Sequence, residues 1–158
     1  MEIGETLTRF IVEEGRKHPE AAGDFTELLV ELTRAGKMIA NEVNKAGLAD
    51  MFGTTGSTNV HGETVQKLDE LANDIIIKSA SGTGRLAAAA SEEMEEIYKV
   101  PGEHLRGDCI LVFDPVDGSS NIDVNVSIGT IFSIYRKLTD GEVGVEDVLR
   151  PAKECACA

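Results

Sequence analysis

Hydrophobic residues recur with a helical period along two long stretches of the chain. Over residues 25–46 they return every three or four positions, which predicts an amphipathic helix. These apolar positions are Leu28, Leu32, Ala35, Ile39 and Val43. Asp24 with Glu27 is typical of a capping box, and Gly47 is a natural helix stop. A second helix is predicted over 63–79. Its expected buried side comprises Val65, Leu68, Ala72, Ile75 and Ile76.

The remaining pattern predicts short strands and loops. A continuous apolar run over 109–113, closed by Pro115, predicts a fully buried strand. Further on, apolar and smaller residues alternate, which predicts a half-buried strand. Its apolar side comprises Val126, Ile128, Thr130, Phe132 and Ile134. Residues 53–59 are a flexible loop by composition.

Two segments give weaker signals. Residues 86–96 begin with an alanine run and continue with glutamates, so propensity alone favours a helix there. A short helical pattern near 145–149 ends at Pro151. Two helices followed by strands predict an α+β protein in which helices cover one face of a sheet.

Length and charge limit the functions that this chain can have. Its 158 residues predict one domain or one large lobe. The net charge of −13 argues against a nucleic-acid partner and suits a protein that attracts cations. We find neither a membrane-spanning window nor a signal peptide. The three cysteines form no zinc spacing or disulfide framework, so we expect a cytoplasmic protein.

The candidate chemistry lies where the buried strand ends. Asp114 and Asp117 stand three residues apart at this point, which is where layered α/β proteins place their sites. Pro115 favours an extended Asp114, and a tight bend would bring Asp117 to the same point. Two converging carboxylates repel unless a hard divalent cation lies between them. Residues 118–120 offer N–H groups and hydroxyls for a phosphate. The alternative is a simple turn, because all these residue types favour turns.

Longer motifs carry a family resemblance. Residues 114–120 (DPVDGSS) resemble the signature of the metal-dependent, lithium-sensitive sugar-phosphatase superfamily. Their continuation over 121–136 is similar to fructose-1,6-bisphosphatase of the class I, bacterial type. Shorter matching segments follow the family order along nearly the whole chain: 6–15, 44–47, 67–69, 72–74 and 91–93.

The resemblance implies a fold and a reaction. Residues 1–158 would form the N-terminal metal- and phosphate-binding domain, the first lobe of an αβαβα architecture, without the second, sugar-binding domain. Residues 86–90 would be a strand feeding the metal loop, not a helix. The reaction would be hydrolysis of the 1-phosphate of fructose 1,6-bisphosphate in gluconeogenesis, in a homotetramer. Two or three Mg²⁺ ions would assist, and Mn²⁺ could substitute. Alternatives are an inositol- or nucleotide-phosphate phosphatase, or a non-catalytic binding or assembly lobe.

The resemblance also implies roles for individual residues. The expected metal ligands are Glu92, Glu93, Asp114, Asp117 and the carbonyl of Val116. The expected phosphate-binding residues are Asp117, Gly118, Ser119 and Ser120. Asp74 would activate the attacking water together with Glu93, and Asp69 would join the site from a closing loop.

Each of these acids also has a purely structural interpretation. Glu92 and Glu93 could belong to a solvated acidic helix face. Asp69 and Asp74 are five residues apart, which places them ~140° apart on an ideal helix, so both could be surface charges.

The family's AMP inhibitor site is altered in this sequence. Gly23 and Thr26 keep the shape of the helix start that holds the AMP phosphate, and Arg136 is at a matching position. Asp108 and Cys109, however, replace the usual Lys-Tyr pair. We therefore expect weak AMP binding or none. Without a second domain, we also expect apolar residues near Ile131 and Val148 to be exposed and the chain to associate.

Overall fold

A computed structural model describes residues 4–17, 24–46, 54–58, 64–102, 106–119 and 127–157 of the chain. Its helices are α1 (Leu7–Lys17), α2 (Asp24–Ala46), α3 (Lys67–Ser81) and α4 (Val145–Val148), with a short 3₁₀ turn at Ala152–Glu154. Its strands are β1 (Thr54–Thr58), β2 (Thr64–Gln66), β3 (Leu86–Ser91), β4 (Tyr98–Lys99), β5 (Cys109–Asp117) and β6 (Gly129–Arg136).

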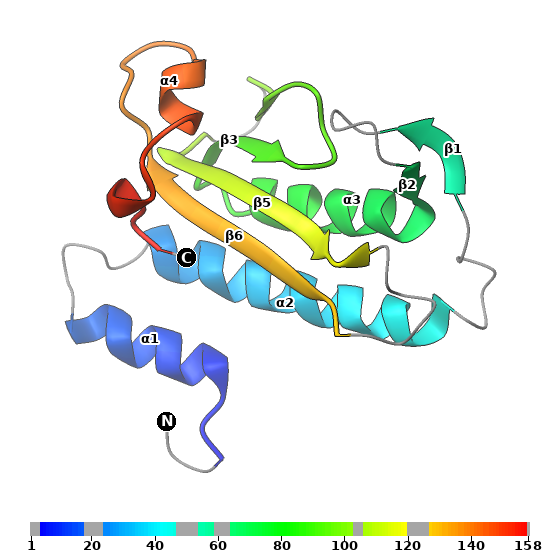
Figure 1. The fold of residues 1–158 in the computed structure, drawn as a ribbon. Coiled ribbons are helices and arrows are strands. Elements are labelled where there is room, and N and C mark those ends of the chain that lie inside the picture. The colour runs from blue at the N-terminus through cyan, green and yellow to red at the C-terminus, as the bar shows by residue number, and fades with distance from the viewer. Residues whose placement is uncertain are drawn as a thin grey trace.

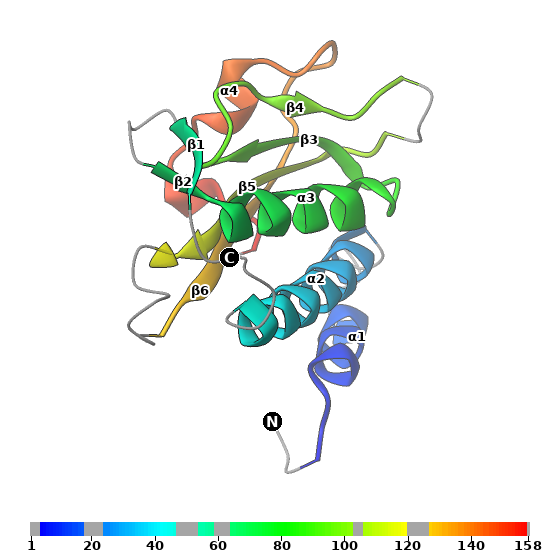
Figure 2. The same ribbon diagram turned by 90° about the vertical axis from the view of Figure 1, so that its right-hand side faces the viewer.

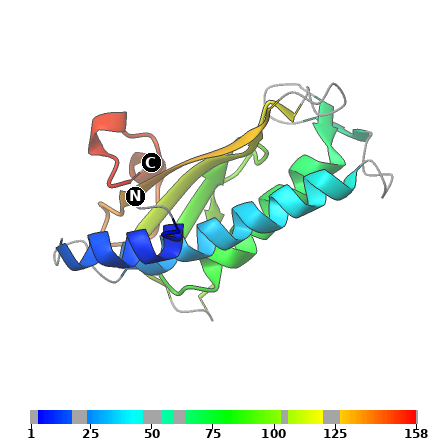
Figure 3. The same cartoon turned by 90° about the horizontal axis from the view of Figure 1, so that it is seen from below.

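A mixed four-stranded sheet forms the centre of the molecule, in the order β4-β3-β5-β6 (Figure 1). Strands β3 and β5 are parallel, and the other two pairings are antiparallel. Helices α2 and α3 cover one face, with α1 outside α2, and α4 lies on the opposite face (Figure 2). The view from below shows α2 crossing under the sheet (Figure 3). This mixed helix-on-sheet arrangement confirms the predicted fold class.

The main core lies between α2, α3 and the sheet. The apolar repeat of α2 faces it, because Leu28, Leu32, Ala35 and Ile39 are all buried. Side chains of α3 and the sheet complete this core, among them Ala72, Ile76, Leu86, Leu111, Phe113 and Ile134. The pattern over 25–46 therefore predicted both the helix and its buried face correctly. No helix in the described part of the chain is long and apolar enough to cross a membrane.

Three local predictions need correction. The second helix begins at Lys67 and not at residue 63, because 64–66 form β2. The segment 54–58, predicted to be part of a flexible loop, is β1 and pairs with β2. Residues 86–91 form strand β3, as the family resemblance implied and against their helical propensity. Ala88 and Ala89 are fully buried there between β4 and β5, so tertiary packing overrides propensity.

The strand and C-terminal predictions are confirmed, with longer bounds for the buried strand. Strand β5 runs beyond Phe113 to Asp117 and buries side chains on both faces. Strand β6 is half-buried from residue 129, and Val126 lies outside the described residues. Helix α4 occupies 145–148, within the predicted helical pattern. None of Cys109, Cys155 and Cys157 forms a disulfide bond.

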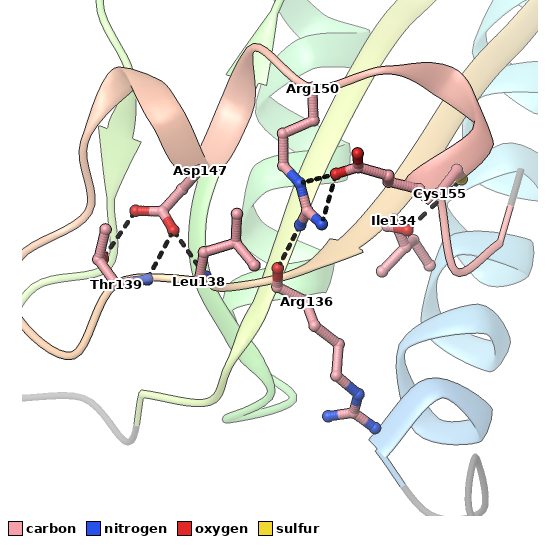
Figure 4. Close-up of polar contacts among 8 residues, drawn as sticks. Ile134, Arg136, Leu138, Thr139, Asp147, Arg150 and Cys155 are labelled. Atoms are coloured by element: carbon pink, nitrogen blue, oxygen red, sulfur yellow. Dashed lines mark hydrogen bonds and ion pairs between the residues drawn. The ribbon is translucent and has the colours of Figure 1, made fainter.

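The segment after β6 is attached to the sheet by polar contacts (Figure 4). Arg150 donates from Nη1 to the backbone oxygen of Arg136 at 2.6 Å, and its guanidinium also pairs with Glu154 at 3.1 Å. Further along, the backbone N–H of Ala156 donates to the oxygen of Ile134 at 2.8 Å. These contacts hold the segment along the outer edge of β6.

Candidate active site

Acidic residues follow both parallel strands of the sheet. Strands β3 and β5 end at the same edge, since Ser91 pairs with Phe113, the residue before Asp114. The N–H of Glu92 donates to the oxygen of Phe113 at 3.0 Å, so the pairing continues one residue beyond β3. Glu92 therefore lies beside Asp114, and both line a groove of about 410 Å³. The carboxyl ends of parallel strands are a usual place for a binding site.

A β-bulge places the two aspartates of the motif on one face of the sheet. Asp114 pairs with Ile131 and Asp117 pairs with Gly129, so β5 contains one more residue than β6 between these pairs. Because Ile131 and Gly129 are two apart, they point to the same face, and so do their partners. In a regular strand, residues three apart would point to opposite faces. The sequence predicted a tight bend here, whereas the structure reaches the same result with a bulge.

The bulge is stabilised by its own side chains. The backbone N–H of Val116 donates to Asp114 Oδ1 at 3.0 Å, which is an Asx turn. Thr130 Oγ1 donates to the carbonyl of Pro115 at 2.9 Å from the neighbouring strand. Asp114 therefore has a fixed position within the last part of β5, while Asp117, the last residue of the strand, is exposed.

The strand turns sharply after Asp117, into the predicted phosphate loop. Gly118 has a φ of +88°, a left-handed conformation that other residues adopt only with strain. Successive N–H groups around such a turn can form a concavity that binds anions. Ser119 is half-buried beside it. Ser120 lies outside the described residues, so its predicted contact with phosphate stays a prediction.

Glu93 points away from the groove of Glu92 and lies against helix α3. It lines a polar pocket of about 480 Å³ together with Glu70, Leu71, Asn73 and Asp74. Its Oε2 atom is buried and finds no hydrogen-bond partner within the part of the chain that the structure describes. Burial raises the pKa of Glu93 to about 8, assisted by a hydrogen bond with Glu92 and by the negative charges of Glu92, Asp69 and Asp114. Three other acids therefore lie close enough to Glu93 to influence it.

Asp69 and Asp74 have different environments, although the sequence placed both in the site. Asp69 is only 2% exposed, and its charge acts on Glu93. The side chain of Asp74 is 62% exposed and forms an ion pair with Lys78 at 3.0 Å. The structure thus brings Asp69 together with Glu92, Glu93 and Asp114, whereas Asp74 lies at the solvent side of the polar pocket. Their separation around α3 was predicted correctly from the spacing.

These carboxylates suit a hard divalent cation. All the possible ligand atoms are oxygens. A cation could also bind the buried Oε2 of Glu93, which has no hydrogen-bond partner among the described residues. Burial, and after it the hydrogen bond from Glu92 and the negative charges of Glu92, Asp69 and Asp114, raise the pKa of Glu93, and a cation would offset that charge. Among the described residues, no three acidic, histidine or cysteine side chains already form a compact metal-binding group. Mutual repulsion between carboxylates is a physical reason for such separation.

Arg136, predicted for the AMP site, has close partners within the protein. Its guanidinium forms an ion pair with Asp108 and lies 4.6 Å from the centre of the Phe25 ring. Thr26 lines a separate pocket of about 350 Å³ between α1 and α2, beside Gly15. Gly23 lies outside the described residues. The residue that replaces the family's lysine is therefore in contact with the arginine expected to bind the anion.

Sequence reasoning missed Asn73, which lines the same polar pocket as Glu93. A signal was present, because Asn73 follows Asp69 by four residues and so lies about 40° from it around the helix. The predicted Asp74 lies on a different side of α3.

Comparison with known proteins identifies the family. The family model described as "Fructose-1-6-bisphosphatase, N-terminal domain" matches residues 5–158. The chain is 48% identical over 155 residues to a protein of Nitratidesulfovibrio vulgaris named "Fructose-1,6-bisphosphatase class 1", which covers 97% of this chain and 46% of that protein. A protein of the same name from Persephonella marina is 52% identical over 141 residues, which cover 89% of this chain and 43% of that protein.

Solved structures agree with the sequence comparison. The holo form of Leishmania major fructose-1,6-bisphosphatase matches with a TM-score of 0.83 and 31% identity, covering 96% of this chain and 46% of that one. The apo form of the same enzyme matches with a TM-score of 0.69 and 32% identity, and the match covers 91% of this chain and 40% of that one. The chain belongs to the class 1 fructose-1,6-bisphosphatase family and matches its N-terminal domain. It spans less than half the length of these curated relatives.

Proposed function

We propose that residues 1–158 are the metal- and phosphate-binding domain of an enzyme that hydrolyses fructose 1,6-bisphosphate to fructose 6-phosphate and phosphate. The observation that carries this proposal is the group of acids at the ends of β3 and β5, in a chain of this family. Its oxygen donors and negative charge suit Mg²⁺ and a phosphate ester.

The proposed roles of the residues are those that the family resemblance implies. Glu92, Glu93, Asp114, Asp117 and the Val116 carbonyl would hold two or three Mg²⁺ ions, or Mn²⁺ in their place. When bound, the cations would polarise the phosphoryl group and lower the pKa of water. The N–H groups and hydroxyls of residues 118–120 would hold the phosphate oxygens.

The attacking water needs a group that accepts its proton. We assign this role to Glu93, because its carboxylate lines the polar pocket beside the other acids of the site. We assign its partner as Asp69, which is buried within range of Glu93, in preference to the exposed Asp74. Water oxygen bonds to phosphorus, the bond from phosphorus to the sugar oxygen breaks, and the departing oxygen takes up a proton.

A substrate panel tests this function. The full-length protein, completed beyond residue 158, should hydrolyse fructose 1,6-bisphosphate in preference to inositol phosphates and nucleotide monophosphates. Preference for one of the latter would assign another phosphatase activity, and no hydrolysis of any ester would indicate a binding or assembly lobe. Glu93→Gln should lower kcat by about 10²–10⁴-fold, the usual range for a general base. The matched control is Glu95→Gln, at an exposed position two residues further on.

The 158-residue chain should lack this activity by itself. The metal and phosphate loop would be present, but the chain spans only 46% of its curated relative. Residues that grip the sugar would belong to the second domain, and a phosphate that is not held in line reacts slowly. We also propose that the completed protein assembles as a homotetramer, which sedimentation of the full-length protein would test.

A further inference from the structure

Asn73 Oδ1 and Glu93 Oε2 are buried and find no hydrogen-bond partner among the described residues, and both residues line the polar pocket of about 480 Å³. A buried polar atom without a partner is destabilising. Because both atoms belong to residues that line one pocket, we infer that the side chains of Asn73 and Glu93 interact.

Helix α3 presents Asn73 toward the acids at the strand ends. Asn73 lies one turn after Asp69, whose charge acts on Glu93. Asp74 and Lys78 pair with each other at the solvent side of the helix. The side chain of Asn73 is therefore the neutral polar group of α3 closest in helical position to the buried acid.

An amide oxygen and a carboxylate oxygen are both acceptors and cannot bond to each other. The two ends of an asparagine amide have nearly the same shape, and a turn of 180° places Nδ2 where Oδ1 lies. We propose that Asn73 is a positioning residue, which donates a hydrogen bond from Nδ2 to Glu93 Oε2 and fixes the direction of that carboxylate. One bond then satisfies both buried positions. The inference rests on the proposed function, in which Glu93 binds metal and accepts a proton.

The first experiment needs neither metal nor substrate. In the ¹⁵N-labelled, metal-free 158-residue chain, the side-chain amide of Asn73 is identified by its loss in Asn73→Ala. Its protons should exchange with water at least about tenfold more slowly than those of Asn41, an exposed asparagine of α2. Glu93→Ala should remove this protection and leave Asn41 unchanged.

The second experiment measures Mn²⁺ affinity of the same chain by electron paramagnetic resonance. Asn73→Ala should weaken Mn²⁺ binding by about tenfold, the lower end of the effect of a residue that orients a metal ligand. Asn41→Ala is the matched control and should leave the affinity unchanged. Asn73→Ser serves where Asn73→Ala does not fold.

The results separate this inference from the proposed function. Exchange as fast as that of Asn41, or protection that persists in Glu93→Ala, would overturn the hydrogen bond. Unchanged Mn²⁺ affinity in a folded Asn73 variant would overturn the positioning role. If the unaltered chain binds no Mn²⁺, the metal site itself fails, while the exchange of the Asn73 amide still decides whether it holds Glu93.

Discussion

Replacing Asp147 with asparagine should destabilise the protein at neutral pH and much less in acid. Asp147 is 0% exposed and accepts four hydrogen bonds. Figure 4 shows those from Leu138 and Thr139. The N–H groups of Leu138 and Thr139 donate to Oδ1 at 2.8 and 3.1 Å. Thr139 Oγ1 and the N–H of Gly144 donate to Oδ2 at 2.8 and 3.0 Å. This carboxylate connects the start of α4 to the chain that leaves β6.

The size of the effect follows from these bonds. An asparagine keeps one oxygen for two donors but presents an amide nitrogen to the other two. The Thr139 hydroxyl can rotate and accept from that nitrogen, so the Gly144 bond is lost outright. With about 1.5–3 kcal/mol for a hydrogen bond to a charged group, and weaker bonds at the oxygen that remains, we expect a loss of about 2–4 kcal/mol.

The pH dependence has a definite sign. Burial of Asp147 raises its pKa, but the hydrogen bonds from Gly144, Leu138 and Thr139 outweigh burial and hold the pKa well below its ordinary value. Its contribution to stability is therefore complete above the unfolded pKa of ~3.9 and is lost as the pH falls through the lower folded pKa. The difference between Asp147→Asn and the unaltered protein should be complete at pH 7 and should shrink below about pH 4.

Urea unfolding at several pH values measures this difference. Protein concentration must be low and constant, because association would add to the apparent stability. Asp140→Asn, an exposed acid on the same connection, is the matched control and should change little. A difference between Asp147→Asn and the unaltered protein that stays the same from pH 7 to pH 3 would refute the reasoning.

Three further predictions concern the site, the effector and the exposed face. The metal-free chain should lose stability as pH rises from about 4.5 to about 8, because over this range the unfolded chain loses the Glu93 proton while burial retains it in the folded chain; urea midpoints should show this loss, and Glu93→Gln should reduce it. AMP should inhibit the completed enzyme weakly or not at all, as measured by AMP titration, because Asp108 pairs with Arg136. The isolated chain should associate, since Ile131 and Leu149 are 56% and 77% exposed and line the same groove as Glu92 and Asp114. Sedimentation should show less association once both residues are replaced by serine.

Each of these predictions has an outcome that contradicts it. Stability independent of pH between 5 and 8 would mean that the surroundings of Glu93 do not raise its pKa. Inhibition at micromolar AMP would show that Arg136 and the helix start at Thr26 suffice despite Asp108. A monodisperse monomer of the unaltered chain would show that the exposed Ile131 and Leu149 do not cause the chain to associate. Replacement of Leu7, an exposed apolar residue of α1, by serine provides a control for the last experiment.

The sequence by itself determined the elements whose signal is local. The period of α2 follows from its own side chains, since one apolar stripe is enough to specify a buried helix face. The apolar run over 109–113 likewise predicts a strand without knowledge of its neighbours. The acids at 114 and 117 could be read as a site because their position at a strand end is visible in the chain. The family motif covered the same residues.

Only the tertiary structure decided features that depend on distant neighbours. Residues 86–91 have helical propensity, yet they form β3 because two partner strands satisfy their backbone groups and bury their small side chains. The β-bulge that puts Asp114 and Asp117 on one face requires β6, which begins twelve residues after Asp117 in the sequence. The burial of Asp69 and the exposure of Asp74 depend on which side of α3 faces the sheet, and spacing gives only their separation. Long-range packing selects among alternatives that local sequence leaves nearly equal in free energy.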